Sequence, residues 1–409
     1  MAEIAGDLNL EPRNIFTFRG VTIPAMKSNR SRLLFLLVSV AALASLRAVD
    51  SGPGRDPATK ALSVFSEVFS LTRGNYVDPT DSKTLLEGAY DGMTDALDPF
   101  SYYVPAASMN AYRAQQASGA VGPGIIVARR GGFPYVVAPL PGSPAQKQQV
   151  QPGDLIHAVD GKNLRNAPLW KITSALEGPE GTTVEVGLFR VVEDKKVTVR
   201  LRRERFTPPP VETKWESDLG IVKVPAFTAS TAEALRNAID EAGRRSIDKL
   251  VLDLRGSIGG DVAEVTPSAA LFVGRGPIAR IVSRKVALKP LEATSERAWK
   301  GRTVLLMDDA TGGPAEVFVA ALKDRANATT VGEATAGLAI IQRLVPTGSG
   351  GSLFMTVGRY QSPSGTILGG KGLSPDERVI TFPGDTESRD PILERGLEVA
   401  RRDVARRAA

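Results

Sequence analysis

The sequence predicts a multidomain α/β protein that combines an N-terminal helical region, a small β domain and an α/β core. Its length of 409 residues corresponds to two to four domains at roughly 100–200 residues each. Apolar residues recur at helical spacing up to residue 117, and short β-rich runs follow from residue 119. After residue 210, strand-like and helix-like segments alternate, which favours an α/β core with a largely parallel sheet.

The composition excludes several classes of protein. Charged residues make up 23% and hydrophobic residues 42% of the chain, which excludes wholesale disorder. The absence of cysteine excludes disulfide scaffolds, thiol catalysis and cysteine-based zinc sites. His157 is the single histidine, so a histidine metal cluster is not expected and any Ser-His-Asp triad depends on that residue. The net charge of +6 is scattered along the chain. We therefore expect no metal, no other cofactor and no nucleic-acid partner.

Residues 1–44 are predicted to comprise an upstream extension and a secretory signal. Leu33–Leu46 is an apolar run of fourteen residues with a basic flank before it, shorter than the roughly 20 residues that span a bilayer. Cleavage is expected after Ala44. This predicts an exported protein of the periplasm or another extracytoplasmic envelope compartment. An uncleaved anchor that tethers the chain to the membrane and a buried core helix remain alternatives, and translation can start at Met1 or at Met26.

Residues 45–117 form the predicted N-terminal helical region. Apolar residues recur at helical spacing over Thr59–Thr72 and again over Leu85–Leu97. Asp98-Pro99 ends the second run, because the residue before a proline disfavours helical backbone.

The predicted β domain occupies residues 118–206. Its strand signals are short apolar runs bounded by Gly and Pro: Gly124–Ala128, Tyr135–Ala138, Leu155–Val159 and Thr183–Phe189. A helix-like segment, Pro168–Leu176, stands between the last two strands. Three consecutive prolines at 208–210 predict a linker to the next domain.

The predicted α/β core occupies residues 207–385. Its strand signals are Gly220–Val224, Lys249–Leu254, Thr303–Met307 and Thr329–Val331. Its helix signals are Thr231–Ala242, Asp261–Phe272 and Ala315–Lys323. The remaining residues, 386–409, carry a predicted C-terminal helix over Pro391–Arg407, which we expect to be basic and exposed to solvent.

The β domain resembles a PDZ domain of the type found in bacterial envelope proteases. The resemblance is carried by Gly122–Ile125, Pro141–Ala145, Pro152–Asp154, Val159–Gly161 and the pair of glycines at 178 and 181. In PDZ domains a peptide adds to a sheet edge, and backbone N–H groups of a Gly-rich loop hold its carboxylate. The resemblance implies that Gly122, Pro123, Gly124 and Ile125 bind the peptide, with one donor fewer because Pro123 has no N–H. A small β domain without a ligand is the alternative. His157 is expected to be a surface or packed imidazole.

Motifs from about residue 60 to residue 385 resemble the carboxyl-terminal (tail-specific) processing peptidases, in the order of that family. These motifs are Gly88–Met93, Leu97–Tyr103, Leu250–Gly260, Tyr360–Gly365 and Gly370–Asp376. The resemblance implies a core of the crotonase/tail-specific-protease-like type. It also implies a serine endopeptidase that uses a Ser–Lys dyad, in which a neutral amine takes the proton of a hydroxyl.

Both dyad positions depart from that pattern. After the strand that ends at Met307, the position that matches the nucleophile is Gly313. The position that matches the lysine is Leu338, twenty-five residues later, and the family's glutamine follows four residues beyond at Gln342. Glu316 is also retained. The expected register is therefore present, while the hydroxyl and the amine are absent.

The oxyanion hole departs as well. One donor is usually the N–H of the residue after the nucleophile, and here that residue is Pro314, which has none. The loop that carries the other donor keeps Gly259 and Gly260, although Ser257 and Ile258 replace the expected Asn and Pro.

These departures predict an exported, PDZ-containing pseudoenzyme that binds protein C-terminal tails or unfolded polypeptides as an adaptor, scaffold or decoy. The alternative is an active serine endopeptidase of the same family with a displaced nucleophile. In this alternative, Ser349 or Ser352 would replace the missing nucleophile and Lys371 the missing base. A third hypothesis is a structural subunit that pairs with an active paralogous peptidase.

Overall fold

The computed structural model describes residues 57–285, 288–381 and 389–402. The described residues divide into two units, with the boundary between Ser82 and Lys83. The predicted signal segment Leu33–Leu46 lies outside the described residues. Of the helices in the described part of the chain, none is both long and apolar enough to cross a membrane.

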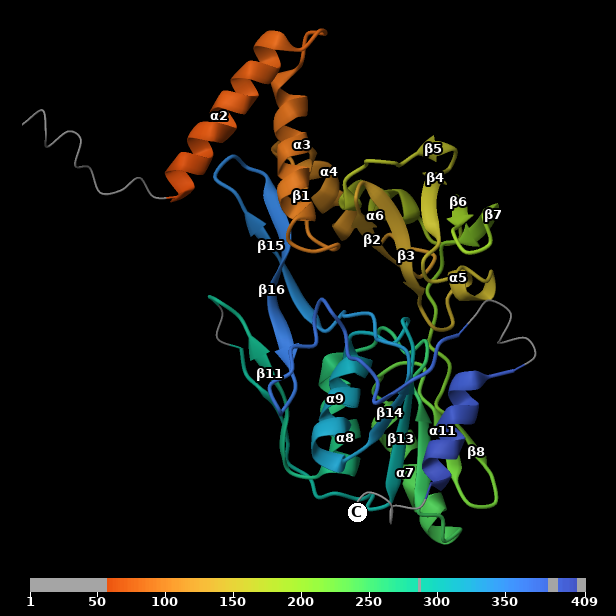
Figure 1. Cartoon of the computed structure of the whole chain (residues 1–409). Coiled ribbons are helices and arrows are strands. Elements are labelled where there is room, and N and C mark those ends of the chain that lie inside the picture. The colour runs from red at the N-terminus through yellow and green to blue at the C-terminus, as the bar shows by residue number, and fades with distance from the viewer. Residues whose placement is uncertain (1–56, 286–287, 382–388, 403–409) are drawn as a thin grey trace, which may run out of the picture. The chain divides into compact units, whose positions relative to one another are not determined.

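The first unit contains helix α2 (Pro57–Asn75), shown in orange in Figure 1. It extends the predicted helix Thr59–Thr72 at both ends. Pro57 opens it at a position where a missing N–H costs nothing. No α2 residue is buried, and the side chains of Leu62 and Phe65 are exposed.

The predicted helical region also contains a short strand that the sequence did not predict. Helices α3 (Ser82–Asp95) and α4 (Ala106–Ala117) flank a short strand, β1 (Tyr102–Val104). This strand pairs antiparallel with β16 (Ser352–Gln361), where the rings of Tyr102 and Phe354 stack with centroids 4.8 Å apart. A three-residue strand carries no periodic signal of its own, because only its distant partner fixes its conformation.

The β domain has the predicted strands together with additional ones. Its elements are β2 (Ile125–Arg130), β3 (Phe133–Pro139), α5 (Pro144–Lys147), β4 (Leu155–Val159), β5 (Lys162–Asn163), α6 (Leu169–Leu176), β6 (Thr183–Arg190) and β7 (Lys195–Arg202). The strand order is β2-β3-β4-β6-β7, so β2 is an edge strand. Alternation along β6 buries Val184, Val186 and Leu188 in the domain core. Residues 203–211, which include the three prolines, contain neither helix nor strand.

The α/β core contains a sheet of order β17-β14-β13-β10-β9-β8. Its strands are β8 (Glu212–Trp215), β9 (Gly220–Lys223), β10 (Lys249–Asp253), β13 (Arg302–Met307), β14 (Thr329–Gly332) and β17 (Glu377–Arg378). All neighbouring pairs are parallel except β8 with β9, which confirms the largely parallel sheet. Leu250 and Leu252 face one side and Val251 the other, as the pleat requires.

Helices cover both faces of this sheet (Figure 1). α7 (Thr231–Arg244), α8 (Val265–Val273) and α9 (Pro314–Ala326) pack on the face that includes Leu250. The predicted helix Asp261–Phe272 begins instead with a 3-10 turn, η1 (Val262–Glu264), because Asp261 caps that turn by accepting the Ala263 N–H at 2.9 Å.

The expectation that the C-terminal helix is simply an exposed, solvated element is wrong. α11 (Pro391–Arg401) covers the second face of the sheet, where Ile392 and Val399 are buried against Val251 and its neighbours. Its approach is close: a Cβ at Gly396 would lie 2.3 Å from Leu306 Cδ2. The helix is amphipathic, with arginines on its outer side, and the basic residues concealed the apolar stripe in the sequence.

A second sheet in this unit has the order β1-β16-β11-β12, with β15 paired to the other side of β16. Its additional strands are β11 (Gly276–Val282), β12 (Leu291–Ala293) and β15 (Ile340–Pro346). Local sequence patterns do not predict these strands. Their pairings contain register shifts, at Pro277/Ala279 and at Ile341/Gln342, which break the two-residue period.

Candidate functional site

The candidate site is built on the turn between β13 and α9. β13 ends at Met307 and α9 begins at Pro314, so Gly313 is the residue that enters the helix. Gly313 has φ +61° and ψ −116°, a left-handed conformation that side chains rarely adopt. A Cβ there would have only one neighbour within 4 Å, the carbonyl oxygen of Leu338 at 3.9 Å. The turn therefore places position 313 next to position 338, and a side chain at position 313 would enter open space.

Glu316 fixes the distance between these two positions. Its side chain is fully buried, and Oε2 accepts the Gly313 N–H at 2.9 Å. Oε1 accepts the Thr335 hydroxyl at 2.5 Å and the Gly337 N–H at 2.7 Å. Burial raises the pKa of Glu316, and these hydrogen bonds oppose the rise. One carboxyl group thus joins the helix entry to the loop that carries Leu338.

The late motif Gly370–Asp376 holds the same loop from its other side. The Gly370 N–H donates to the Gly337 carbonyl at 2.8 Å, and the Leu373 N–H donates to Thr335 Oγ1 at 2.8 Å. A Cβ at Gly372 would lie 2.1 Å from the Thr335 carbonyl oxygen. The motif therefore acts as a backbone clamp in this chain, and Lys371 is exposed at its surface.

Asp308 anchors the turn to the glycine loop after β10. Its carboxyl oxygens accept the Gly256 N–H at 2.9 and 3.1 Å, and Oδ1 accepts the Thr311 hydroxyl at 2.8 Å. Burial raises the pKa of Asp308. The Gly312 N–H donates to the Ser257 carbonyl at 2.9 Å. These bonds bring the predicted oxyanion loop alongside the helix entry.

The interior of the site is aliphatic. A Cβ at Gly312 would lie 3.0 Å from Ile258 Cδ1 and 3.1 Å from Leu338 Cδ1, so both side chains converge there. They belong to one apolar cluster, whose members come from the core and from the β domain: Ile258, Ala310, Leu338, Ile126, Ala138 and Leu140. Pro314 is buried at the start of α9 and has no N–H to offer.

A cavity of about 420 Å³ opens on this interior. Its lining is Phe100, Tyr102, Ile125, Ile126, Val127, Leu169, Thr173, Ile258, Gly259, Gly313, Pro314, Leu338, Ile340, Gln342 and Phe354. The structure thus brings together the predicted positions Gly313, Leu338, Gln342 and Gly259 with Ile125 of the predicted peptide loop. Among the described residues that line it, there is no serine, lysine, histidine, aspartate or glutamate.

The cavity continues into the groove between β2 and α6, which contribute Ile125–Val127, Leu169 and Thr173. The Gly124 carbonyl accepts the Leu140 N–H at 2.8 Å. Because the peptide bonds are trans, the Ile125 N–H points the opposite way, toward the free edge of β2. The Pro123 carbonyl is held by the Ala145 N–H at 3.0 Å. The predicted peptide loop therefore uses its carbonyls within the domain and leaves the β2 edge available.

The glycine loop keeps backbone donors. Gly259 and Gly260 have φ of +85° and +87°, and Gly259 lines the cavity while Gly260 does not. A Cβ at Gly260 would lie 2.2 Å from the Phe227 carbonyl oxygen, so only glycine fits there. Within the described part of the chain, neither glycine N–H has a hydrogen-bond partner.

The residues suggested for a displaced nucleophile lie elsewhere. Ser349 occupies the turn between β15 and β16, where it contacts Thr347, and Ser352 pairs with Val104 of β1. Neither lines the cavity, and neither does Lys371. Ser257 was not predicted as a functional residue, yet its hydroxyl is buried and has no hydrogen-bond partner among the described residues. The signal in the sequence was that Ser257 stands where the family pattern has asparagine.

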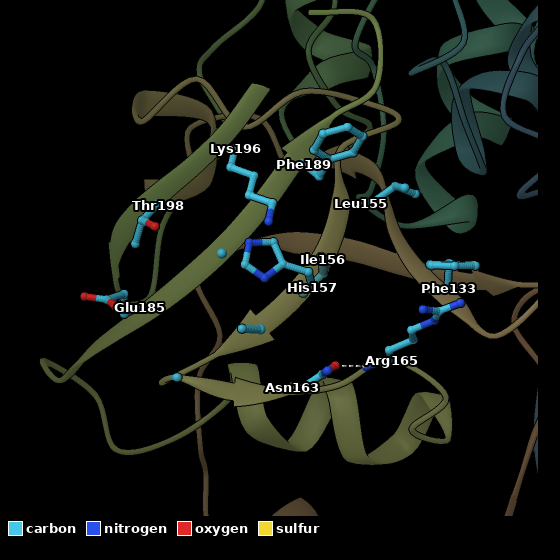
Figure 2. A pocket seen from close by; sticks show the side chains of 13 residues that line it. Phe133, Leu155, Ile156, His157, Asn163, Arg165, Glu185, Phe189, Lys196 and Thr198 are labelled. Carbon is cyan, nitrogen blue, oxygen red and sulfur yellow. Dashed lines mark hydrogen bonds between the residues drawn. The ribbon is translucent and has the colours of Figure 1, made fainter. Parts of the chain in front are cut away.

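A larger cavity, of about 620 Å³, lies on the strands of the β domain (Figure 2). It includes His157, whose ring covers Gly187: a Cβ at Gly187 would lie 2.6 Å from His157 Cε1. At its rim the Arg165 guanidinium lies 4.6 Å from the centroid of the Phe133 ring. No residue of the helix-entry site lines this cavity. His157 is a surface residue, as expected, and is no part of the site at Gly313.

The described residues contain no group of three or more histidine, aspartate or glutamate side chains that could hold a metal ion. The neighbouring carboxylates of Asp308 and Asp309 do not form such a group. Asp308 accepts hydrogen bonds from Gly256 and Thr311. Asp309 is exposed only in part, and its partial burial and the charges of Asp308 and Glu333 raise its pKa to about 6.

Three models of known families match the chain in order. Residues 41–108 match the activating protease CtpB N-terminal domain, residues 135–190 match a PDZ domain, and residues 218–379 match peptidase family S41. These matches confirm the predicted multidomain fold: an N-terminal helical domain, a PDZ domain and an α/β core of the S41 type.

Relatives match over most of the chain. The carboxy-terminal-processing protease of Bartonella bacilliformis is 30% identical over 327 residues, which cover 78% of this chain and 74% of that protein. The carboxy-terminal processing protease CtpA of Bacillus subtilis is 27% identical over 362 residues, which cover 85% and 77% of the two chains. Among solved structures, the photosystem II D1 C-terminal processing protease matches with a TM-score of 0.61 and 26% identity, over 83% of this chain and 97% of that one. The chain belongs to the C-terminal processing peptidases of family S41.

Proposed function

We propose that this chain is a catalytically inactive member of its family that binds the C-terminal tails of proteins, or unfolded polypeptides, as an adaptor. The observation that carries the proposal is the lining of the cavity at Gly313. Peptide hydrolysis by this family's chemistry needs a hydroxyl and an amine in hydrogen-bond reach of each other. The cavity instead presents the backbone of Gly313 and the aliphatic side chain of Leu338.

Binding is supported by features that do not depend on catalysis. β2 is an edge strand, with the Ile125 N–H directed to its free side, and an extended peptide can add to such an edge. The groove beside it has the size and apolar character typical of a ligand site. A C-terminal tail supplies both a strand and a carboxylate, which suits an edge strand next to backbone donors.

The decisive experiment is hydrolysis of casein by the purified chain, with an active member of the family as a positive control. We expect no cleavage by the wild type. In parallel, calorimetry with a peptide that ends in leucine should detect binding. Cleavage by the wild type would overturn the inactive assignment, and absence of any binding would overturn the adaptor role.

A second candidate function, an active endopeptidase with a displaced nucleophile, is favoured by one observation. Ser257 has a buried hydroxyl without a partner in the described part of the chain, and its carbonyl contacts Gly312 beside the site. The Ser257→Ala variant separates the two functions. If the wild type cleaves casein and Ser257→Ala does not, Ser257 is the nucleophile; cleavage that survives the substitution would place the nucleophile elsewhere.

Export completes the proposal. The run Leu33–Leu46 after basic residues has the layout of a secretory signal, and we propose that the chain acts in the periplasm or another envelope compartment. Fractionation of cells that carry the full-length chain tests this. Recovery in the cytoplasmic fraction would contradict it, and recovery in the membrane fraction would indicate an uncleaved anchor.

A further inference from the structure

The groove of the PDZ domain and the interior of the helix-entry site form one cavity. The same space of about 420 Å³ is lined by Ile125 and Leu169 of the PDZ domain and by Ile258 and Leu338 of the core. The two parts meet at the start of β2. The Gly124 carbonyl accepts a hydrogen bond from the Leu140 N–H. The side chain of Leu140 reaches the core, because a Cβ at Gly259 would lie 3.1 Å from Leu140 Cδ2.

This arrangement decides where a bound tail ends. A tail whose carboxylate lies at the loop before β2 runs along the β2 edge and ends beside Ile125. From that end of β2 the same cavity continues to Ile258 and Leu338, whose side chains converge above Gly312. Ile125 and Gly259 both line the cavity, and the N–H of Gly259 has no hydrogen-bond partner among the described residues, so a carboxylate at this end would have backbone donors on both sides.

We propose that Leu338 and Ile258 form the specificity pocket for the last side chain of the bound tail, and that this pocket selects an aliphatic or aromatic residue. The inference rests on the proposed binding function and assigns its selectivity to the core in addition to the PDZ domain. The described lining carries no charged side chain, so a charged terminal residue would lose its hydration without gaining a partner.

The test is a charge swap at position 338. Leu338 is only partly buried, so the variant Leu338→Lys places an ammonium group in the pocket without opening a closed core. Two peptides that differ only in their last residue, leucine or aspartate, are titrated by calorimetry into the wild type and the variant. Leu97→Lys is the matched control, because Leu97 is 54% exposed and does not line the cavity.

We expect the wild type and Leu97→Lys to prefer the leucine-ended peptide by at least about tenfold, the scale of one buried side chain's transfer. Leu338→Lys should lose that preference and bind the aspartate-ended peptide more tightly than the wild type does. Such a gain cannot come from misfolding. Amidation of the leucine-ended peptide should weaken its binding to the wild type by roughly 10–150-fold, the range for hydrogen bonds to a charged group.

The possible results distinguish a failure of the proposed specificity pocket from a failure of tail binding itself. If the wild type binds the leucine-ended peptide and Leu338→Lys keeps the same affinity and preference, the specificity pocket is wrong while tail binding stands. If the wild type binds neither peptide, tail binding itself fails. If amidation has no effect, the carboxylate is not held between Ile125 and Gly259.

Discussion

Two regions of opposite chemistry lie side by side at the entry to α9. The polar frame consists of Asp308, Thr311, Glu316, Thr335 and Gly337, whose buried groups hydrogen-bond to one another and to neighbouring backbone. The apolar interior consists of Ile258, Ala310, Pro314 and Leu338. The polar frame holds residues 313 and 338 in place. The side chains of the apolar interior determine which chemical groups those two positions present to the cavity.

The difference shows why geometry and chemistry can separate in such a site. Each member of the polar frame satisfies a donor or acceptor that is buried in the core, so its removal leaves a partner unpaired. Side chains of the apolar interior have no such partners, so exchanges among them leave no buried polar group unpaired. The hydrogen bonds that hold the turn therefore do not depend on which side chains stand at positions 313 and 338.

The largest effect is expected from restoring chemistry to the interior. The triple variant Gly313→Ser, Pro314→Ala and Leu338→Lys supplies a hydroxyl, a backbone N–H and an amine within the existing frame. We expect weak casein hydrolysis by the triple variant and none by Gly313→Ser alone, because loss of one member of a catalytic unit costs up to about 10⁶-fold. The missing oxyanion donor costs roughly a further 10²–10³-fold.

Recovery should be partial for a structural reason. The new lysine must fit where Leu338 now packs beside Ile258, with Gln342 as a polar neighbour in the cavity. Efficient cleavage by Gly313→Ser alone would show that position 338 does not hold the base, and would remove the contrast between frame and interior.

The next effect is on stability and concerns the frame. Glu316→Ala leaves the N–H groups of Gly313 and Gly337 and the hydroxyl of Thr335 buried without an acceptor. At about 1–3 kcal/mol for each unpaired group, we expect a loss of about 3 kcal/mol or more in the free energy of unfolding. Urea denaturation measures it. Glu233→Ala, at an exposed position of α7, is the control; equal losses in the two variants would contradict the role of Glu316.

A smaller effect separates backbone strain from crowding at the elbow. Gly313→Ala adds a Cβ to open space but at φ +61°, so we expect a loss of about 1–2 kcal/mol from the left-handed conformation alone. Gly243→Ala is the matched control, since Gly243 lies in α7 with nothing within 4 Å and alanine favours helix there by about 0.5–1 kcal/mol. The two changes in unfolding free energy should have opposite signs, and a stabilising Gly313→Ala would refute the strained turn.

The smallest effect concerns Asp309, which adjoins the frame without belonging to it. Partial burial and the charges of Asp308 and Glu333 raise the pKa of Asp309 to about 6 in the folded chain. Because the folded state then binds the proton more tightly than the unfolded state, this carboxyl favours folding at low pH and opposes it as the pH rises through 6. Asp309→Asn should therefore stabilise at pH 7.5 and less so at pH 5.

The stabilisation is expected to stay below about 1 kcal/mol, since Asp309 is exposed and water screens its neighbours' charges. The measurement is the pH dependence of urea midpoints for the variant and the wild type. Asp240→Asn, an exposed carboxylate of α7, provides the baseline. A stabilisation that grows toward pH 5 would reverse the sign and contradict the raised pKa.

Local patterns predicted most elements of this fold, and the exceptions share a cause. β4 (Leu155–Val159) begins and ends where its apolar run does. By contrast, β1 depends on pairing with β16, and the buried stripe of α11 depends on the face of the sheet that it covers. Elements whose conformation comes from a distant partner carry a weak local signal, because the free energy that stabilises them is not in their own residues.

The sequence by itself determined the family, the order of the domains and the side chains at the matched positions. The absence of a hydroxyl at Gly313, of an amine at Leu338 and of an N–H at Pro314 is covalent, so no folding can alter it. Only the tertiary structure decided that Glu316 ties the helix entry to the loop of Leu338, and that this interior opens into the PDZ groove. Those contacts join residues far apart in the chain, and their distances exist only once the sheets and helices have packed.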